Sequence, residues 1–169
     1  MKRLLLLAFS LLLIAYGSVI VNERLAVARL KNVSPVVSKT LPAVVFSAGD
    51  SSFVFRPYDN ETAGKLVELL PKTLVMTRWG DGAYSASLSG KADVSGNETS
   101  HRRAFFKGEV VFSPKRNALF LMFDATPVAL TVDAPMLLSS GGIPVGRLEN
   151  YQELEPLPGV VEFSVKIKK

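Results

Sequence analysis

The sequence predicts a mainly β domain that folds as a closed or nearly closed barrel, with one amphipathic helix, a short helical turn and a preceding N-terminal apolar helix. Three observations support this. The chain has 169 residues, and removal of its apolar N-terminus leaves roughly 120 residues, enough for one domain. One segment alone carries a clear helical stripe. From Thr73 onward, short apolar or alternating runs are separated by turn residues, and closure into a barrel removes the edges such strands would expose.

Composition excludes several kinds of site. The sequence contains no cysteine, which rules out a thiol nucleophile, cysteine-ligated zinc, a disulfide framework and a lipoprotein anchor. The formal net charge of +5 is modest, and much of the excess lies at the two ends of the chain. A nucleic-acid surface needs basic residues gathered on one folded face, so we expect no nucleic-acid partner. We also expect no cofactor.

The N-terminus reads as a membrane segment. Lys2 and Arg3 precede an apolar run from Leu4 to Val21, which as a helix would span roughly 27 Å, close to the ~30 Å of a bilayer core. Basic residues before the run predict that the domain lies outside the cytoplasm. The length of the run favours an uncleaved single-pass anchor. The alternative is a signal peptide that is cleaved near Gly17, which would release a secreted protein.

The predicted organisation has three parts. Residues 1–21 form the anchor or signal peptide, residues 22–48 form a stalk, and residues 49–169 form the barrel domain. Pro35 and Pro42 lie in the stalk and prevent a continuous helix there.

The barrel domain opens with a strand and a helix. Residues 51–56 alternate, with Phe53 and Phe55 on one face. A helix follows, with Asp59 as its expected N-cap and Pro71 as its end. Its core-facing stripe has the spacing i, i+3, i+4, i+7 and consists of Ala63, Leu66, Val67 and Leu70.

The remaining elements are predicted from runs between turn residues. The expected strands are 73–79, 83–89, 108–112, 118–123, 143–148 and 160–167. Tyr84, Ala86 and Leu88 share one face of the second of these. The expected loops are 90–103 and 127–142, with a turn at 80–82 and a helical turn at 150–154.

An ordered set of short motifs in this domain resembles a known family. The motifs are Arg78-Trp79-Gly80-Asp81, Gly108-Glu109-Val110-Val111-Phe112-Ser113-Pro114, the run Ala118 to Phe123 continuing into Thr126-Pro127, and Pro144-Val145-Gly146-Arg147-Leu148. Their order and spacing are similar to those of small prokaryotic cyclophilin-like proteins, β-barrel domains of uncharacterised function. The resemblance covers roughly residues 51–169 and implies a cyclophilin-like barrel.

The resemblance also implies a possible catalytic residue. Arg78 falls near the arginine that true cyclophilins use for prolyl isomerisation, where a guanidinium that donates to the proline nitrogen weakens amide resonance. The sequence departs from the enzymes around it. Met76 and Thr77 precede Arg78 where the enzymes have Phe-His, and residues 82–85 lack their phenylalanine and glutamine. Phe120 corresponds to a later aromatic residue of the pocket.

Binding residues are expected at the mouth of the barrel, where an aromatic side chain and a fixed cation suit a ligand. The candidates are Trp79, Tyr84 and Phe120, beside Arg78. A structural alternative for Arg78 and Trp79 is a stacked pair that covers the mouth, with the guanidinium held by Asp81.

Other chemistry has little support in the sequence. His101 is the one histidine and falls in a polar loop, as a solvated residue would. Carboxylates are scattered over strand ends and loops, so no metal site is expected. Asn97 lies in a glycosylation sequon within the loop 90–103 and is the best candidate for that modification, whereas Asn60 lies at the helix start and is more simply a cap.

These observations lead to three functional hypotheses. The first is a membrane-tethered, extracytoplasmic, cyclophilin-like binding module for a peptide or small molecule. The second is a weak peptidyl-prolyl isomerase that uses Arg78, and the third is a structural component of the cell envelope.

Overall fold

The computed structural model describes residues 35–70, 72–88, 101–124 and 136–168. These residues form nine strands, one α-helix and one 3-10 helix. The strands are β1 (Val44–Ala48), β2 (Ser51–Pro57), β3 (Thr73–Trp79), β4 (Ala83–Ser87), β5 (Arg102–Phe105), β6 (Glu109–Ser113), β7 (Ala118–Met122), β8 (Met136–Leu148) and β9 (Val160–Ile167). The helices are α2 (Glu61–Leu69) and η2 (Tyr151–Leu154).

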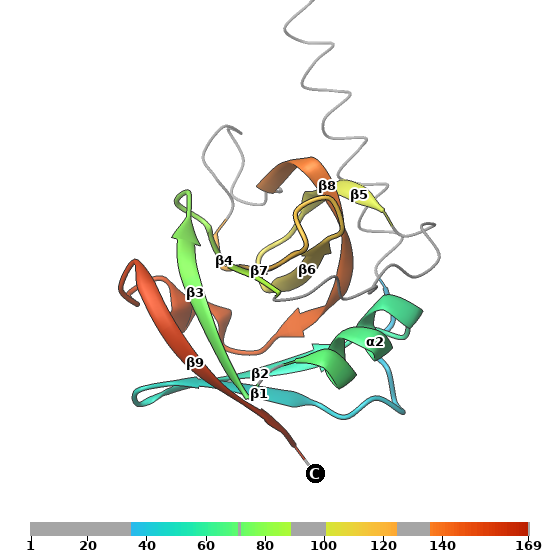
Figure 1. Ribbon diagram of the computed structural model, residues 1–169, viewed down its shortest axis with the longest axis horizontal. Coiled ribbons are helices and arrows are strands. Elements are labelled where there is room, and N and C mark those ends of the chain that lie inside the picture. Colours follow the sequence, from blue (N-terminus) through green and yellow to red (C-terminus); the bar gives the residue numbers. More distant parts are fainter. Residues whose placement is uncertain (1–34, 71, 89–100, 125–135, 169) are drawn as a thin grey trace, which may run out of the picture. The chain divides into compact units, whose positions relative to one another are not determined.

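Eight of the strands close into an antiparallel barrel (Figure 1). They follow the order β2-β1-β9-β3-β4-β7-β6-β8, and β8 pairs with β2 to complete the ring. The ninth strand, β5, pairs with the first part of β8 and lies outside the ring. The predicted mainly β class and the closed barrel are therefore confirmed for the part of the chain that the structure describes.

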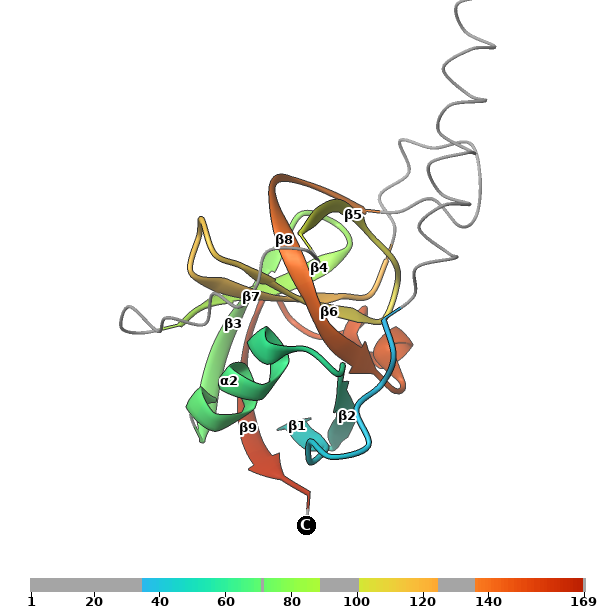
Figure 2. The ribbon, with the colours of Figure 1, turned by 90° about the vertical axis from the view of Figure 1, so that its right-hand side faces the viewer.

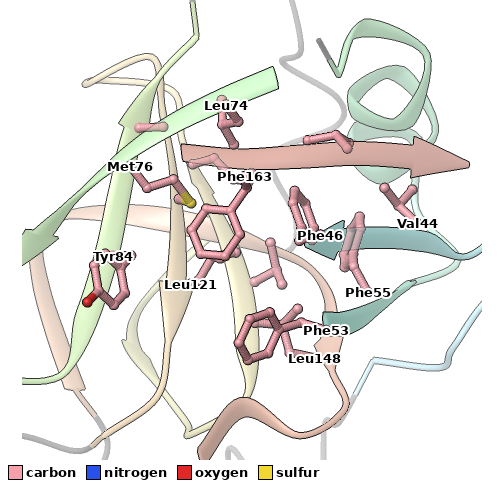
Figure 3. Close-up of a cluster of buried hydrophobic side chains, with 14 of the residues drawn as sticks. Val44, Phe46, Phe53, Phe55, Leu74, Met76, Tyr84, Leu121, Leu148 and Phe163 are labelled. Atoms are coloured by element: carbon pink, nitrogen blue, oxygen red, sulfur yellow. The ribbon is translucent and has the colours of Figure 1, made fainter. Parts of the chain in front are cut away.

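Large side chains fill the interior of the barrel. Alternate residues of β1, β2, β3 and β9 point inward, as the period of two for a strand requires. Figure 3 shows the resulting aromatic cluster, in which Phe163 packs at steep angles against Phe46 and Phe53, with ring centroids 6.3 and 6.0 Å apart. These rings are fully buried, so they form a packed core inside the barrel.

The helix α2 contributes to this core. Ala63, Leu66 and Val67 are buried in it, as the stripe predicted, and α2 lies against β2 and β8. Of the two cap residues that the sequence suggested, Asp59 was wrong and Asn60 is confirmed. Asn60, not Asp59, has the extended cap conformation, and its Oδ1 accepts a hydrogen bond from the Ala63 N–H at 2.8 Å.

A second, smaller apolar layer covers part of the outside of the barrel. The strand β5 and the first part of β8 fold over the outer face of β6 and β7 (Figure 2). Phe105 of β5, Val111 of β6 and Phe120 of β7 meet in this layer. Both faces of β6 and β7 are therefore buried, which explains why their sequences are continuous apolar runs instead of alternating ones.

Three segments differ from the sequence expectation. β1 lies within the segment 22–48 assigned to a stalk, so the barrel begins earlier than residue 49. β5 occupies part of the expected loop 90–103, and β8 begins at Met136, inside the expected loop 127–142. Each of these strands is recruited by pairing with a distant segment, and such pairing leaves little trace in local sequence.

Other predictions fall outside the described residues. These include the apolar run 4–21 and Asn97. Within the described ranges, no helix has the length and hydropathy needed to cross a bilayer.

Candidate functional site

An open groove with a volume of about 430 Å³ runs over the outer face of the barrel where the second apolar layer ends. Its walls come from β3, β4 and β7 and from the turn between β6 and β7. The lining residues are Val75, Thr77, Trp79, Ser85, Ala86, Ser87, Arg116, Ala118 and Phe120.

Two aromatic side chains form one wall of the groove. The ring of Trp79 meets the ring of Phe120 edge to face, with centroids 5.3 Å apart and an interplanar angle of 78°. Phe120 is almost fully buried, whereas Trp79 is only partly covered. The indole therefore presents apolar surface at the border of the outer layer.

The floor of the groove carries hydroxyl groups. Thr77 of β3 lies directly across from Ser85 of β4, and Ser85 lies across from Phe120 of β7. Ser87 is the next outward residue of β4 and is exposed. Hydroxyls beside an aromatic wall provide both donors and acceptors for a polar ligand.

Arg116 stands over the aromatic wall. Its guanidinium carbon lies 5.6 Å from the centroid of the Trp79 ring, and its Nε donates to the Ser140 Oγ at 3.3 Å. The turn is fixed by Asn117, which adopts a left-handed φ of 45° and donates from Nδ2 to the Leu88 carbonyl at 2.8 Å. The fold therefore holds a cation at the groove.

Arg78 and Tyr84 lie on the opposite side of the sheet from the groove. Successive strand residues point to opposite faces, so Trp79 faces outward and Arg78 faces the barrel mouth. Arg78 donates from Nη1 to the Glu155 carbonyl at 2.9 Å, and its guanidinium carbon lies 5.0 Å from the Phe123 ring centroid. This carbonyl occupies the role that the sequence suggested for Asp81.

Tyr84 is fully buried, and its hydroxyl interacts with the side chain of Arg78. Its hydroxyl lies 2.7 Å from the carbonyl oxygens of both Leu157 and Pro158. Burial raises the pKa of this hydroxyl above its usual value of 10.0, while the nearby Arg78 lowers it. Through these hydrogen bonds, Tyr84 links β4 to the segment before β9.

The sequence-predicted candidates thus divide into two pairs. Trp79 and Phe120 meet at the groove, and Arg78 and Tyr84 meet at the barrel mouth. Sequence reasoning missed Arg116 and the hydroxyl floor. The signal for the floor was present, since Thr77 and Ser85 alternate with inward residues of their strands, whereas nothing local links Arg116 to Trp79.

A second depression, of about 390 Å³, lies where β2 meets β8. Its lining includes Arg56, Arg147, Glu149 and Tyr151, and Arg56 Nε pairs with the Glu149 carboxylate at 2.5 Å. This surface is charged, and two of its charged residues, Arg56 and Glu149, are paired with each other. The first groove has the aromatic wall that ligand sites favour, so it is the stronger candidate.

The titratable groups with displaced pKa values do not line the groove. Burial raises the pKa of Tyr58 to about 12 and raises that of Glu109 above its usual 4.5. Hydrogen bonding to Asp124 raises the pKa of Lys107. Among the described residues, no cluster of three or more His, Asp or Glu side chains could hold a metal ion.

Comparison with known proteins places the fold in context. The chain resembles the solution structure of a hypothetical protein from Archaeoglobus fulgidus with a TM-score of 0.58, at 17% identity, over 80% of this chain and 98% of that one. This similarity concerns the fold alone. No curated protein matches the chain. The model of the cyclophilin-like family matches residues 46–166, most of the chain and nearly the whole barrel. The resemblance seen in the sequence is therefore confirmed, and the protein belongs to the cyclophilin-like family.

Proposed function

We propose that this protein is a binding module whose groove on the outer face of the barrel holds a short extended peptide. The single observation that carries the proposal is the contact between Trp79 and Phe120 at the point where the outer apolar layer stops. A partly covered indole beside a row of hydroxyls is a surface on which a ligand gains both apolar contact and hydrogen bonds.

Two features favour a peptide over a small molecule. Small-molecule sites enclose most of the ligand, but this groove is open and crosses three strands. Apolar surface also continues beyond it, because Val160 of β9, which lies across from Thr77, is 61% exposed, and Val75 of β3 is 56% exposed. An extended chain contacts such a row of sites, whereas a compact ligand would leave much of it uncovered.

The position of Arg78 argues against prolyl isomerisation as the main function. Its guanidinium is held by the Glu155 carbonyl and the Phe123 ring, on the face of β3 opposite the groove. A peptide in the groove would therefore not meet the cation that the isomerase hypothesis needs. A proline-peptide isomerisation assay on the full chain tests this hypothesis, and a rate that Arg78→Ala abolishes would restore it.

Binding is measurable through Trp79, because the chain contains one tryptophan. Pools of acetylated, amidated tetrapeptides are titrated against the full chain while indole fluorescence is followed. We expect saturable quenching or enhancement. Ser85→Gln, which lays a longer side chain across the groove floor, should abolish it. The matched control Ser52→Gln, at an exposed position of β2, should retain it. A response of equal size in both variants would contradict the proposal.

We also propose that residues 4–21 tether this domain to a membrane, with the barrel on the extracytoplasmic side. The support is the uninterrupted apolar run after Lys2 and Arg3. Cell fractionation with alkaline extraction tests the tether. Retention in the membrane pellet is expected, and a soluble product that begins near Ser18 would show cleavage and secretion instead.

A further inference from the structure

We infer that the peptide bound in the groove carries a carboxylate, which the guanidinium of Arg116 receives. This inference rests on the proposed function and names the chemical class of its ligand.

The geometry of Arg116 supports this role. One side of the guanidinium is used by the Trp79 ring and one donor, Nε, by the Ser140 hydroxyl. Among the described residues, the structure gives the two terminal Nη groups no hydrogen-bond or ion-pair partner. These groups form the planar fork that suits a carboxylate. A cation that already contacts a ring and a hydroxyl loses less conformational freedom when it binds.

The charge balance of the groove favours an anion with a single charge. Arg116 is the one charged residue among the described residues that line it. A neutral peptide would leave this charge unmatched, while a phosphate group with nearly two charges would meet a single cation. The carboxylate of one acidic side chain balances it.

The structural alternative is that Arg116 simply covers Trp79. In that case its removal would alter the environment of the indole and the stability of the turn, but it would not change the preference for acidic over neutral peptides. The decisive measurement is therefore the ratio of two affinities, which a purely structural role would not move.

The experiment compares two matched peptide pools on the full chain. Both contain acetylated, amidated tetrapeptides built from Ala, Leu, Phe and Ser; one pool has Glu at a single position and the other has Gln there. Trp79 fluorescence reports binding. We expect the Glu pool to bind about five-fold more tightly, as one partly exposed ion pair allows. The preference should disappear in Arg116→Gln and persist in Lys115→Gln, which removes the neighbouring cation outside the groove.

Two further probes separate the sources of the anion. We expect inorganic phosphate alone to leave the fluorescence unchanged, because it lacks an apolar body for Trp79. We expect 3-phenylpropionate to bind more weakly than the Glu pool, because it covers less of the groove. If it binds as tightly as the Glu pool, the ligand is a small carboxylic acid and the peptide part of the inference is overturned.

The outcomes distinguish this inference from the proposed function. Equal binding of the two pools to the unmodified chain would overturn the carboxylate inference and leave the peptide groove standing. A preference that persists in Arg116→Gln would show that another group receives the charge. If neither pool perturbs Trp79, the proposed function itself fails.

Discussion

At the scale of single residues, the direction of each side chain on β3 decides what it can do. Arg78 and Trp79 are neighbours in the sequence, but one points to the barrel mouth and the other to the groove. Each makes a cation–ring contact with a residue from another part of the chain. The Phe123 ring lies under the Arg78 guanidinium, and the Arg116 guanidinium lies over the Trp79 ring. A motif of adjacent residues therefore contributes to two separate regions.

One residue-scale prediction concerns the buried ion pair between Arg102 and Glu109. Glu109 is 6% exposed and also accepts a hydrogen bond from the Phe106 N–H at 2.8 Å. Arg102→Met leaves this carboxylate buried without its cation and should lower the free energy of unfolding at neutral pH by about 3 kcal/mol. Urea unfolding measures it. In the control, Arg56→Met breaks an ion pair that is nearly half exposed and should change stability by less than about 0.5 kcal/mol. Equal losses would show that burial of the pair is unimportant.

The pH dependence of the same carboxyl gives a second prediction. Burial raises the pKa of Glu109 in the folded state above 4.5, against the lowering effect of Arg102. Between the unfolded and folded pKa values the folded state binds more protons, so this group's contribution to stability falls as pH rises through that window. Arg102→Met removes the main lowering effect and should widen the window. Its deficit in urea unfolding should shrink as the pH is lowered toward about 5. A deficit that does not vary with pH would contradict this assignment.

At the scale of elements, α2 depends on one cap. Asn60 accepts from the Ala63 N–H and also donates from Nδ2 to the Pro144 carbonyl of β8 at 3.1 Å. Asn60→Ala should lower the free energy of unfolding by about 1 to 2 kcal/mol, since it removes both the cap and a link to the barrel. Asp59→Ala is the matched control and should have an effect below about 0.5 kcal/mol. Chemical denaturation compares them, and a larger loss for Asp59→Ala would make Asp59 the cap.

Elements with a local pattern were predictable from the sequence, and those that depend on distant pairing were not. β2, β4 and β9 alternate, and α2 has its stripe, so each was expected near its observed bounds. By contrast, β1 follows two prolines, which favour an irregular stalk, although it pairs with both β2 and β9.

The candidate site shows the same division. Trp79 was identifiable as an aromatic residue at a strand end and Phe120 from the family resemblance, but their contact arises because β4 lies between β3 and β7. Arg116 reaches Trp79 through this strand order and through the hydrogen bond of Asn117 to Leu88. Neither of these contacts leaves a periodic pattern in the sequence.

At the scale of the whole barrel, closure determines where a ligand can bind. The interior is filled with aromatic and aliphatic side chains, and the outer face of β6 and β7 is covered by β5 and β8. The outer face that remains open on β3 and β4 borders this cover. The groove therefore lies on the outer face of the barrel, at the border of the second apolar layer.

Closure itself depends on the seam between β2 and β8, where Gly146 lies opposite Pro57. A Cβ at this position would lie 2.1 Å from Phe55 Cε2 and 2.5 Å from the Arg56 carbonyl oxygen, so the seam would have to open. Gly146→Ala should therefore lower the free energy of unfolding by about 3 kcal/mol, as overpacking against backbone does. Gly159→Ala is the control: among the described residues other than its two chain neighbours, no heavy atom lies within 4 Å of a Cβ added there, and its stability should match or slightly exceed that of the unmodified chain. Urea unfolding of both variants measures the difference. Equal stability would mean that the two strands can separate at this point without loss, and that the ring is held closed by its other pairings.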